Sequence, residues 1–248
     1  MSAPGTHIPH AAFVLAAGLG TRMRELTATI PKPMVPLLGV PLIDRVLDGI
    51  AAAQIPRAVV NVHYRADVLE THLATRSKPA ITISDERGQL LDTGGGVMKA
   101  WPHLKHGPFL IHNSDSVWIE GIGRNLDRLC RAFDPATMDC LMLLAPISTS
   151  MGYEGAGDFD MDSDGRLSRR IEGRQTPFVF AGVSINHPRL FVDAPRGAFS
   201  LNKVWNGAID RGRLYGQRMD GIWMHVGTPE AVVEAERRLS HEDVTQPS

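Results

Sequence analysis

The chain has 248 residues, of which 43% are hydrophobic and 21% are charged, and its formal net charge at pH 7 is -1. This length suits one large domain with a buried core. The near-neutral, interleaved charge excludes the broad basic surface by which many proteins bind nucleic acid, so a phosphorylated ligand would need a local site.

The N-terminus and the cysteines indicate the compartment. The first ten residues lack a positively charged region, and the apolar run at residues 11–17 is too short for a signal peptide or a membrane span. Cys130 and Cys140 have no CxxC spacing, which favours a reducing compartment and two small core side chains. We predict a cytoplasmic protein with no membrane partner, and monomer or homodimer stays open.

Strands and helices alternate along the first half of the chain. Apolar residues at helical spacing predict helices, and short apolar runs between turn residues predict strands. The predicted strands are residues 12–16, 58–62, 80–84 and 109–112, and the predicted helices are residues 42–54, 66–75 and a segment after Thr93. This order is typical of a mainly parallel sheet covered by helices on both faces.

The second half is richer in strands. We predict a helix at residues 125–133, strands at 141–146, 158–161, 167–171 and 178–185, a helix at 201–211, and one strand near 215–224. A last helix begins at Thr228-Pro229-Glu230, where Thr caps and Pro suits the first turn, and the chain after about residue 240 should be loose. The predicted fold is α/β, Rossmann-like, with three α/β/α layers, a mostly parallel central sheet and a strand-rich second half.

A glycine-rich loop follows the first predicted strand. Gly18 and Gly20 would let backbone N–H groups approach a polyphosphate closely, beside the start of a helix. The third glycine of a dinucleotide-binding loop is absent, and no Gly-Lys-Ser/Thr follows, so neither common glycine-rich loop is present. Arg22 instead offers a fork of donors for phosphate oxygens, and we expect prolines 31 and 33 to hold Lys32 on an extended backbone.

These residues belong to a longer pattern. The run LAAGLGTRM at residues 15–23, followed by Pro31-Lys32-Pro33, resembles the signature of the sugar-1-phosphate nucleotidyltransferases. The glycine loop LDTGGG at residues 91–96 resembles the family's loop that faces the base and sugar. The strand FLIHNSD at residues 109–115 resembles the one that ends in the magnesium-binding aspartate, here Asp115, a hard oxygen ligand of the kind Mg²⁺ prefers.

Two later motifs extend the resemblance. Glu172-Gly-Arg174 and the run 178–182, which ends at Gly182, are similar to the family's acceptor-sugar segment, although many relatives carry Lys near the Arg174 position. The segment WMHVGTP at residues 223–229 matches the closing motif except that His225 replaces the usual aspartate, a second magnesium ligand. Imidazole suits Mn²⁺, Co²⁺ or Zn²⁺ better than Mg²⁺, so His225 is either a metal ligand with an altered preference or a structural residue.

The resemblance implies one domain over residues 1–248, with a nucleotide-binding half at about 11–115 and a sugar-phosphate-binding half at about 116–240. It implies Mg²⁺, with Mn²⁺ as a possible substitute, and in-line transfer of a nucleotidyl group without a covalent enzyme intermediate. The implied roles are Arg22 and Lys32 for catalysis on the triphosphate; Ala16, Ala17, Gly18, Gly20, Thr21, Gly94, Gly95, Gly96 and Asn113 for the nucleotide; Asp92, Glu172, Arg174 and Gly182 for the sugar phosphate; Asp115 and His225 for the metal.

The resemblance implies a nucleoside triphosphate and a sugar 1-phosphate as substrates. The short chain and its glycine-loop and closing motifs are most similar to N-acetylmuramate-1-phosphate uridylyltransferases of cell-wall recycling, which favours UTP, with mannose-1-phosphate guanylyltransferase as the alternative. A non-catalytic nucleotide-sugar sensor and an enzyme that transfers sugar from a finished nucleotide sugar are alternatives from other classes. The retained Arg22, Lys32 and Asp115 argue against the sensor, and the second class would not need Arg22 and Lys32.

One acidic segment imitates a calcium loop. Residues 160–165, DMDSDG, copy the start of an EF-hand, but position twelve is Ile171 instead of Glu and the flanks alternate like strands. We predict a hairpin turn there. Other histidines, among them His63 and His112, lack ligand spacing and a nucleophile partner, so we predict structural or exposed roles for them.

Overall fold

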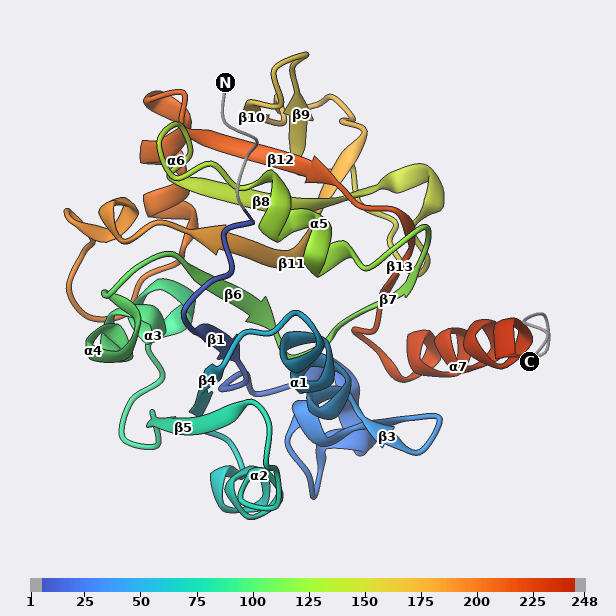
Figure 1. Ribbon diagram of the computed structural model, residues 1–248. Helices are drawn as coiled ribbons and strands as arrows, with labels where there is room; N and C mark the ends of the chain where they lie inside the picture. Colours follow the sequence, from blue (N-terminus) through green and yellow to red (C-terminus); the bar gives the residue numbers. More distant parts are fainter. Residues whose placement is uncertain (1–5, 244–248) are drawn as a thin grey trace.

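One mixed sheet runs through the protein, whose computed structural model describes residues 6–243 (Figure 1). The strand order is β12–β8–β11–β6–β1–β4–β5, and a β9–β10 hairpin joins the same sheet beside β11. All neighbouring pairs along this order are parallel except the two that β11 makes with β6 and β8. The strands are β1 (Ala12–Leu15), β4 (Arg57–Val62), β5 (Ala80–Asp85), β6 (Phe109–Asn113), β8 (Cys140–Pro146), β9 (Phe159–Met161), β10 (Leu167–Arg169), β11 (Phe178–Asn186) and β12 (Leu214–Arg218).

Helices cover both faces of this sheet, which confirms the predicted three layers (Figure 1). Side chains of β1 alternate between two cores: Ala12 and Val14 lie in one, and Phe13 lies in the other. The first core contains residues of α1 (Leu42–Ala52), α2 (Ala66–Leu73) and α5 (Asn125–Ala132). The second contains residues of α3 (Asp92–Lys99), α4 (Trp101–Leu104), α6 (Asn202–Asp210) and the turn η4 (Pro188–Phe191).

The predicted single strand near residues 215–224 is wrong. The chain forms β12 and then β13 (Gly221–His225), and these strands lie in different sheets. Asp220 is held between them because its N–H donates to Asn125 Oδ1 at 2.8 Å and its carbonyl accepts from Asn125 Nδ2 at 2.7 Å. β13 pairs antiparallel with β7 (Ser116–Glu120), a strand that the sequence pattern did not reveal.

The segment around Lys32 also differs from the prediction. Pro31 is extended, but Lys32 begins a short 3-10 turn, η2 (Lys32–Met34), in which the Val35 N–H donates to the Lys32 carbonyl at 3.0 Å. The turn follows η1 (Thr21–Thr27), and a small hairpin follows it, β2 (Pro36–Leu37) and β3 (Val40–Pro41). The last helix, α7 (Pro229–Asp243), begins as predicted: the Ala231 N–H donates to the Thr228 hydroxyl at 3.2 Å.

Several smaller predictions are confirmed. Asp162 Oδ1 accepts from the N–H groups of Asp164 and Arg166, and this turn joins β9 to β10. Cys130 and Cys140 are both buried free thiols. The predictions for residues 1–5 and for the end of the chain after residue 243 lie outside the described residues.

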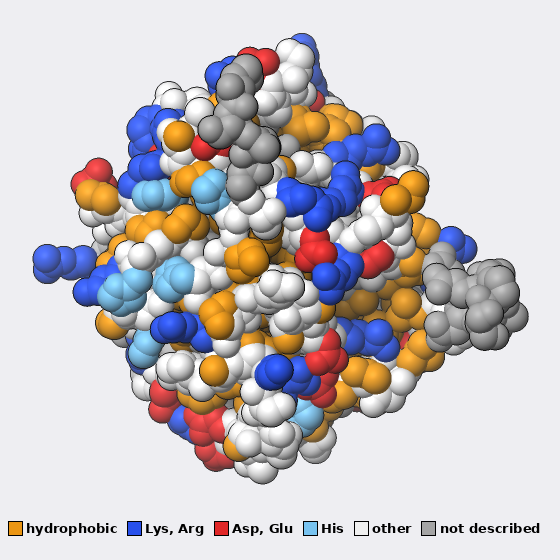
Figure 2. Space-filling view, viewed as in Figure 1, with side chains coloured by type: hydrophobic (Ala, Val, Ile, Leu, Met, Phe, Trp, Pro, Cys, Tyr) orange, Lys and Arg blue, Asp and Glu red, His pale blue; other side chains and the backbone are white. Residues whose placement is uncertain are grey.

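Charges of both signs are spread over the face of the protein that Figure 2 shows. Figure 2 shows Lys and Arg side chains interspersed with Asp and Glu side chains over the viewed face. Within residues 6–243, every helix is too short or too polar to cross a membrane.

His112, on β6, gives a testable pH dependence. Its side chain is buried, its ring stacks on Trp118 at 5.6 Å, and Nδ1 lies 2.7 Å from the carbonyl oxygen of Asn113. Burial lowers the pKa of His112 from 6.5 to about 4, although the Asn113 carbonyl and the Asp115 charge oppose that shift. Unfolded chains therefore bind this proton first, and stability is lost as the pH falls from 6.5 toward 4.

When the pH falls from about 7.5 to about 5, we expect the unfolding free energy of the parent protein to decrease by about 2 kcal/mol because of His112. His112→Gln has no imidazole to protonate at this position and should not show this decrease. Denaturant unfolding of both proteins at the two pH values measures the difference. Equal pH dependence in the two proteins would contradict a neutral buried imidazole.

Candidate active site

A cavity of about 480 Å³ opens where β1, β4, β5 and β6 end. Carboxyl ends of parallel strands are where ligands collect in such sheets, because the connecting loops diverge there. We call it the active-site cavity. Its lining comprises Leu15, Ala16, Ala17, Gly18, Gly20, Thr21, Arg22, Met23, Lys32, Pro33, Asn61, Glu86, Leu90, Asp92, Thr93, Asn113, Ser114, Asp115, Ala198 and Gly227.

Two lining residues that the sequence analysis missed hold the loops together. Asn61 Oδ1 accepts from the N–H groups of Ala16 at 2.6 Å and Ala17 at 3.2 Å. Asn61 Nδ2 donates to Glu86 Oε1 at 2.8 Å, and Glu86 Oε2 accepts from the Leu91 N–H at 3.1 Å. The Ala16 and Ala17 N–H groups, which were predicted to bind the nucleotide, therefore donate to a side chain of the protein. A polar residue inside an apolar strand and a carboxylate directly after a strand were the available signals.

Gly20 lets two turns of the site approach each other. Its φ is 64°, and a Cβ there would lie 3.0 Å from Lys32 Cβ, so any other residue would be strained and crowded. Gly18 differs, because a Cβ there would meet nothing within 4 Å, which leaves its backbone open to a ligand. Arg22 follows on η1, is exposed, and makes no hydrogen bond or ion pair with residues 6–243.

Lys32 and Asp115 contact each other. The Lys32 ammonium donates to Asp115 Oδ2, and the two side chains are 13% and 28% exposed. The predicted roles of the two residues were separate: Lys32 was expected to contact phosphate, and Asp115 was expected to bind the metal. Their contact means that one charged pair stands at the carboxyl end of β6, largely shielded from solvent.

His225 lies near the same pair, on the other sheet, but it is not among the residues that line the active-site cavity. Its ring packs against Trp223 and Tyr153. In the β7–β13 register His225 lies opposite Ser116, the residue after Asp115. Gly227 makes room for it: a Cβ at Gly227 would lie 2.8 Å from His225 Nε2. Burial lowers the pKa of His225, the Asp115 charge opposes this, and the Arg22 and Lys32 charges lower it further. The neutral imidazole is therefore favoured, and that is the form that binds metals.

These donors fit one kind of metal site. Within the described part of the chain, no group of three or more His, Cys, Asp or Glu side chains could hold a metal ion. A closed, all-protein cage is therefore not formed by these residues. One carboxylate and one neutral imidazole fit a cation that takes its remaining ligands from substrate phosphates and water.

The predicted base-facing glycines lie behind the cavity wall. The N–H groups of Gly94 and Gly95 donate to the Phe199 carbonyl at 2.8 and 3.2 Å, and a Cβ at Gly94 would lie 2.3 Å from the Phe199 ring. Gly96 is equally enclosed, with Glu86 Oε1 2.9 Å from such a Cβ. Asp92 lines the cavity with φ 59°, a left-handed backbone that a non-glycine residue rarely adopts.

The predicted acceptor residues are divided. Gly182 packs beside the site, because a Cβ there would lie 2.9 Å from Asn113 Nδ2 and 2.8 Å from the Ser116 hydroxyl. Glu172 and Arg174 are exposed on the turn between β10 and β11, outside the cavity lining. Their role in acceptor binding stays a prediction.

The chain is similar to several known proteins. A family model described as nucleotidyl transferase matches residues 11–242. N-acetylmuramate alpha-1-phosphate uridylyltransferase of Caulobacter vibrioides is 45% identical, over 94% of this chain and 98% of that protein. The enzyme of the same name from Neisseria meningitidis serogroup B is 31% identical, over 91% and 96%. The structure of HddC from Yersinia pseudotuberculosis complexed with GMP-PN superposes with a TM-score of 0.72 at 20% identity, over 92% of this chain and 99% of that one, and so shares the fold.

Proposed function

Because this chain belongs to the nucleotidyl transferase family, we propose that its active-site cavity joins a nucleoside triphosphate to a sugar 1-phosphate and releases pyrophosphate. The observation that carries the proposal is the convergence of Arg22, Lys32 and Asp115 at one cavity at the carboxyl end of β6. The lining holds these two cations and three carboxylates, Glu86, Asp92 and Asp115. Cations beside a carboxylate suit a triphosphate with its metal ion.

The proposed substrates are UTP and N-acetylmuramate 1-phosphate. Both relatives named above carry this activity in their names, and the alignments cover nearly the whole of each chain. The product would be UDP-N-acetylmuramate, which enters cell-wall recycling. We place the enzyme in the cytoplasm, where nucleoside triphosphates are available and where its two free, buried thiols suit a reducing environment.

The chain's own residues act mainly by positioning and by charge. An oxygen of the sugar 1-phosphate attacks the α-phosphorus of the triphosphate, a new P–O bond forms, and the bond to the β-phosphate oxygen breaks as pyrophosphate leaves. Arg22 has its donors uncommitted, and Lys32 is held beside Asp115, so both cations can stabilise negative charge on the transferred and leaving phosphates.

Asp115 and His225 would hold the divalent cation, Mg²⁺ or Mn²⁺, which, when bound, neutralises phosphate charge. We assign the nucleotide to residues 11–115 and the acceptor to residues 116–240, with Asn113 and Gly182 at their junction. Gly182 packs against Asn113 and Ser116 there, and Glu172 and Arg174 would reach the acceptor only if their exposed turn approaches the cavity.

A pyrophosphate-release assay tests the proposal. The purified protein is incubated with each of UTP, GTP, dTTP and CTP against N-acetylmuramate 1-phosphate and mannose 1-phosphate, with Mg²⁺ and with Mn²⁺. We expect release with UTP and N-acetylmuramate 1-phosphate. Release only with GTP and mannose 1-phosphate would make the protein a guanylyltransferase. No release with any pair would favour the non-catalytic sensor, and sugar transfer from a finished nucleotide sugar would favour the third class.

His225 predicts the metal preference. Imidazole binds Mn²⁺ better than Mg²⁺, whereas a carboxylate suits Mg²⁺, so we expect His225→Asp to raise the ratio of Mg²⁺-supported to Mn²⁺-supported activity by about tenfold. Rates at saturating substrates over a titration of each metal measure this ratio. The control is His63→Asn, which alters a histidine bonded to the Glu86 carbonyl at 2.7 Å, away from Asp115. An unchanged ratio in His225→Asp would show that His225 is only structural.

A further inference from the structure

A second cavity, of about 580 Å³, lies at the other end of the sheet. Its charged lining residues are Asp139, Arg189, Asp193, Lys203, Arg211 and Arg213, and we call it the arginine cavity. The strand register fixes its position. Phe109, the first residue of β6, pairs with Asn186 of β11, and Asn186 pairs with Cys140 at the start of β8. The arginine cavity therefore lies at the end of the sheet where β6 begins, and Phe109 at that end is about 20 Å along the chain from Asp115.

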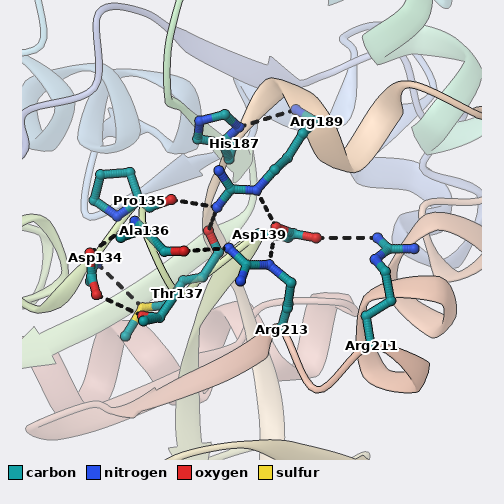
Figure 3. A network of polar contacts seen from close by, with 10 residues as sticks. Asp134, Pro135, Ala136, Thr137, Asp139, His187, Arg189, Arg211 and Arg213 are labelled. Atoms are coloured by element: carbon teal, nitrogen blue, oxygen red, sulfur yellow. Dashed lines mark hydrogen bonds and ion pairs between the residues drawn. The ribbon is translucent and has the colours of Figure 1, made fainter.

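A buried carboxylate organises the arginines. The Asp139 side chain is 3% exposed and accepts from Arg189 Nε, from Arg213 Nε at 2.7 Å and from Arg211 Nη2 at 3.2 Å (Figure 3). Burial alone would raise the pKa of Asp139, but the hydrogen bonds from the three guanidinium groups outweigh it and keep the pKa below its ordinary value. One fixed negative charge thus faces three positive ones.

Two of the arginines also donate hydrogen bonds to the backbone. Arg189 Nη2 donates to the Met138 carbonyl at 2.6 Å, and Arg213 Nη2 donates to the Ala136 carbonyl at 2.8 Å (Figure 3). These bonds fasten the turn before β8 to the starts of η4 and β12. The positions of Arg189 and Arg213 are therefore explained by their contribution to the fold.

Arg211 and Lys203 make no such bonds to the backbone of residues 6–243. Arg211 uses a single one of its five N–H donors, on Asp139, and its side chain is 51% exposed. Lys203, on α6, is exposed and makes no side-chain hydrogen bond or ion pair with residues 6–243. The cavity lining carries four cations and two carboxylates, so its formal charge is +2 before any ligand enters.

We propose that the arginine cavity is a second ligand site, which binds the phosphate group of a small phosphorylated molecule. A phosphate dianion matches the surplus of two positive charges, and a guanidinium presents paired donors that fit its oxygens. The volume of the cavity exceeds what one phosphate group needs, which leaves space for the organic part of the ligand. This site is separate from the active-site cavity, because the two have no lining residue in common.

The test uses inorganic phosphate as the probe, in calorimetric titrations at constant ionic strength. The double variant Lys203→Ala/Arg211→Ala removes the unpaired lysine and the arginine that makes a single bond, to Asp139. It leaves the bonds of Arg189 and Arg213 to Asp139 and to the backbone in place. We expect millimolar or tighter binding to the parent protein and at least about tenfold weaker binding to the double variant, because charge-assisted hydrogen bonds are lost. Thermal unfolding of the double variant should match the parent protein.

Two controls locate the binding. Arg57→Ala removes an exposed cation at the start of β4 and should bind like the parent protein. Lys32→Ala disables the active-site cavity and should still bind the phosphate. If the double variant binds as tightly as the parent protein, if Lys32→Ala abolishes binding, or if the parent protein binds no phosphate at about 10 mM, the second site does not exist.

Discussion

Replacement of Asp115 by Asn should lower kcat by about a thousandfold while the protein stays folded. Asp115 is the one carboxylate at the carboxyl end of β6 that lines the active-site cavity, and Asn keeps its shape but loses the charge that a divalent cation requires. A loss of this size corresponds to about 4 kcal/mol of transition-state stabilisation. Initial rates of pyrophosphate release, with thermal unfolding of both proteins, measure it.

The matched control is Asp160→Asn, which removes an exposed carboxylate from β9. It should leave the rate within about twofold, because isolated surface charges contribute little. If Asp115→Asn keeps more than about a tenth of the parent rate over a full metal titration, Asp115 does not hold the catalytic metal.

Lys32→Met should lower kcat by about a hundredfold or more and, unlike Asp115→Asn, should not weaken the apparent affinity for the divalent cation. Lys32 stabilises phosphate charge in the proposed reaction, so its loss raises the barrier. It also donates to Asp115 Oδ2, so a cation that binds this oxygen must displace the Lys32 ammonium. Methionine fills similar space without the charge and frees that oxygen.

Titration of Mn²⁺ against each protein without substrate separates these effects. We expect equal or tighter Mn²⁺ binding in Lys32→Met and clearly weaker binding in Asp115→Asn. Lys105→Met, a change at an exposed lysine after α4, is the control for lost positive charge. Weaker Mn²⁺ binding in Lys32→Met would show that the Lys32–Asp115 pair preorganises the carboxylate instead of competing with the metal.

Local patterns predicted the elements that depend on local physics. The helix α1 was evident from Leu42, Val46 and Ile50 at helical spacing, and all three are buried. The hairpin at residues 160–165 was evident from its turn residues. The glycine loop and the carboxyl end of β6 bring most of the residues predicted to bind the nucleotide, and Asp115, to one cavity, because the order of parallel strands dictates where their ends meet.

Features that depend on distant partners were not predicted. β7 forms because β13, about a hundred residues later, pairs with it, and the break at Asp220 exists because Asn125 binds that backbone. No local pattern contains either fact. The 3-10 turn at Lys32 likewise follows from its packing against Gly20, whereas the flanking prolines alone favour an extended chain.

Asn61 and Glu86 illustrate a different limit. Each was visible as a polar residue on or after an apolar strand, but its partners were not. The Asn61 side chain bonds to a loop 45 residues earlier, and Glu86 is buried by that network. Burial of a carboxylate is strongly unfavourable unless hydrogen bonds compensate for the lost water, and those bonds form only in the folded arrangement.

The antiparallel strand β11 has a consequence for synthesis of the chain on the ribosome. β6 pairs with β1 on one side and with β11 on the other, and β11 follows β6 by more than sixty residues. A nascent chain that has released β1 to β6 therefore presents the backbone N–H and C=O groups along one edge of β6 unpaired until residue 186 emerges. Such an edge invites pairing with a neighbouring chain, so slow translation between residues 113 and 186 is the interval in which this protein most needs a chaperone.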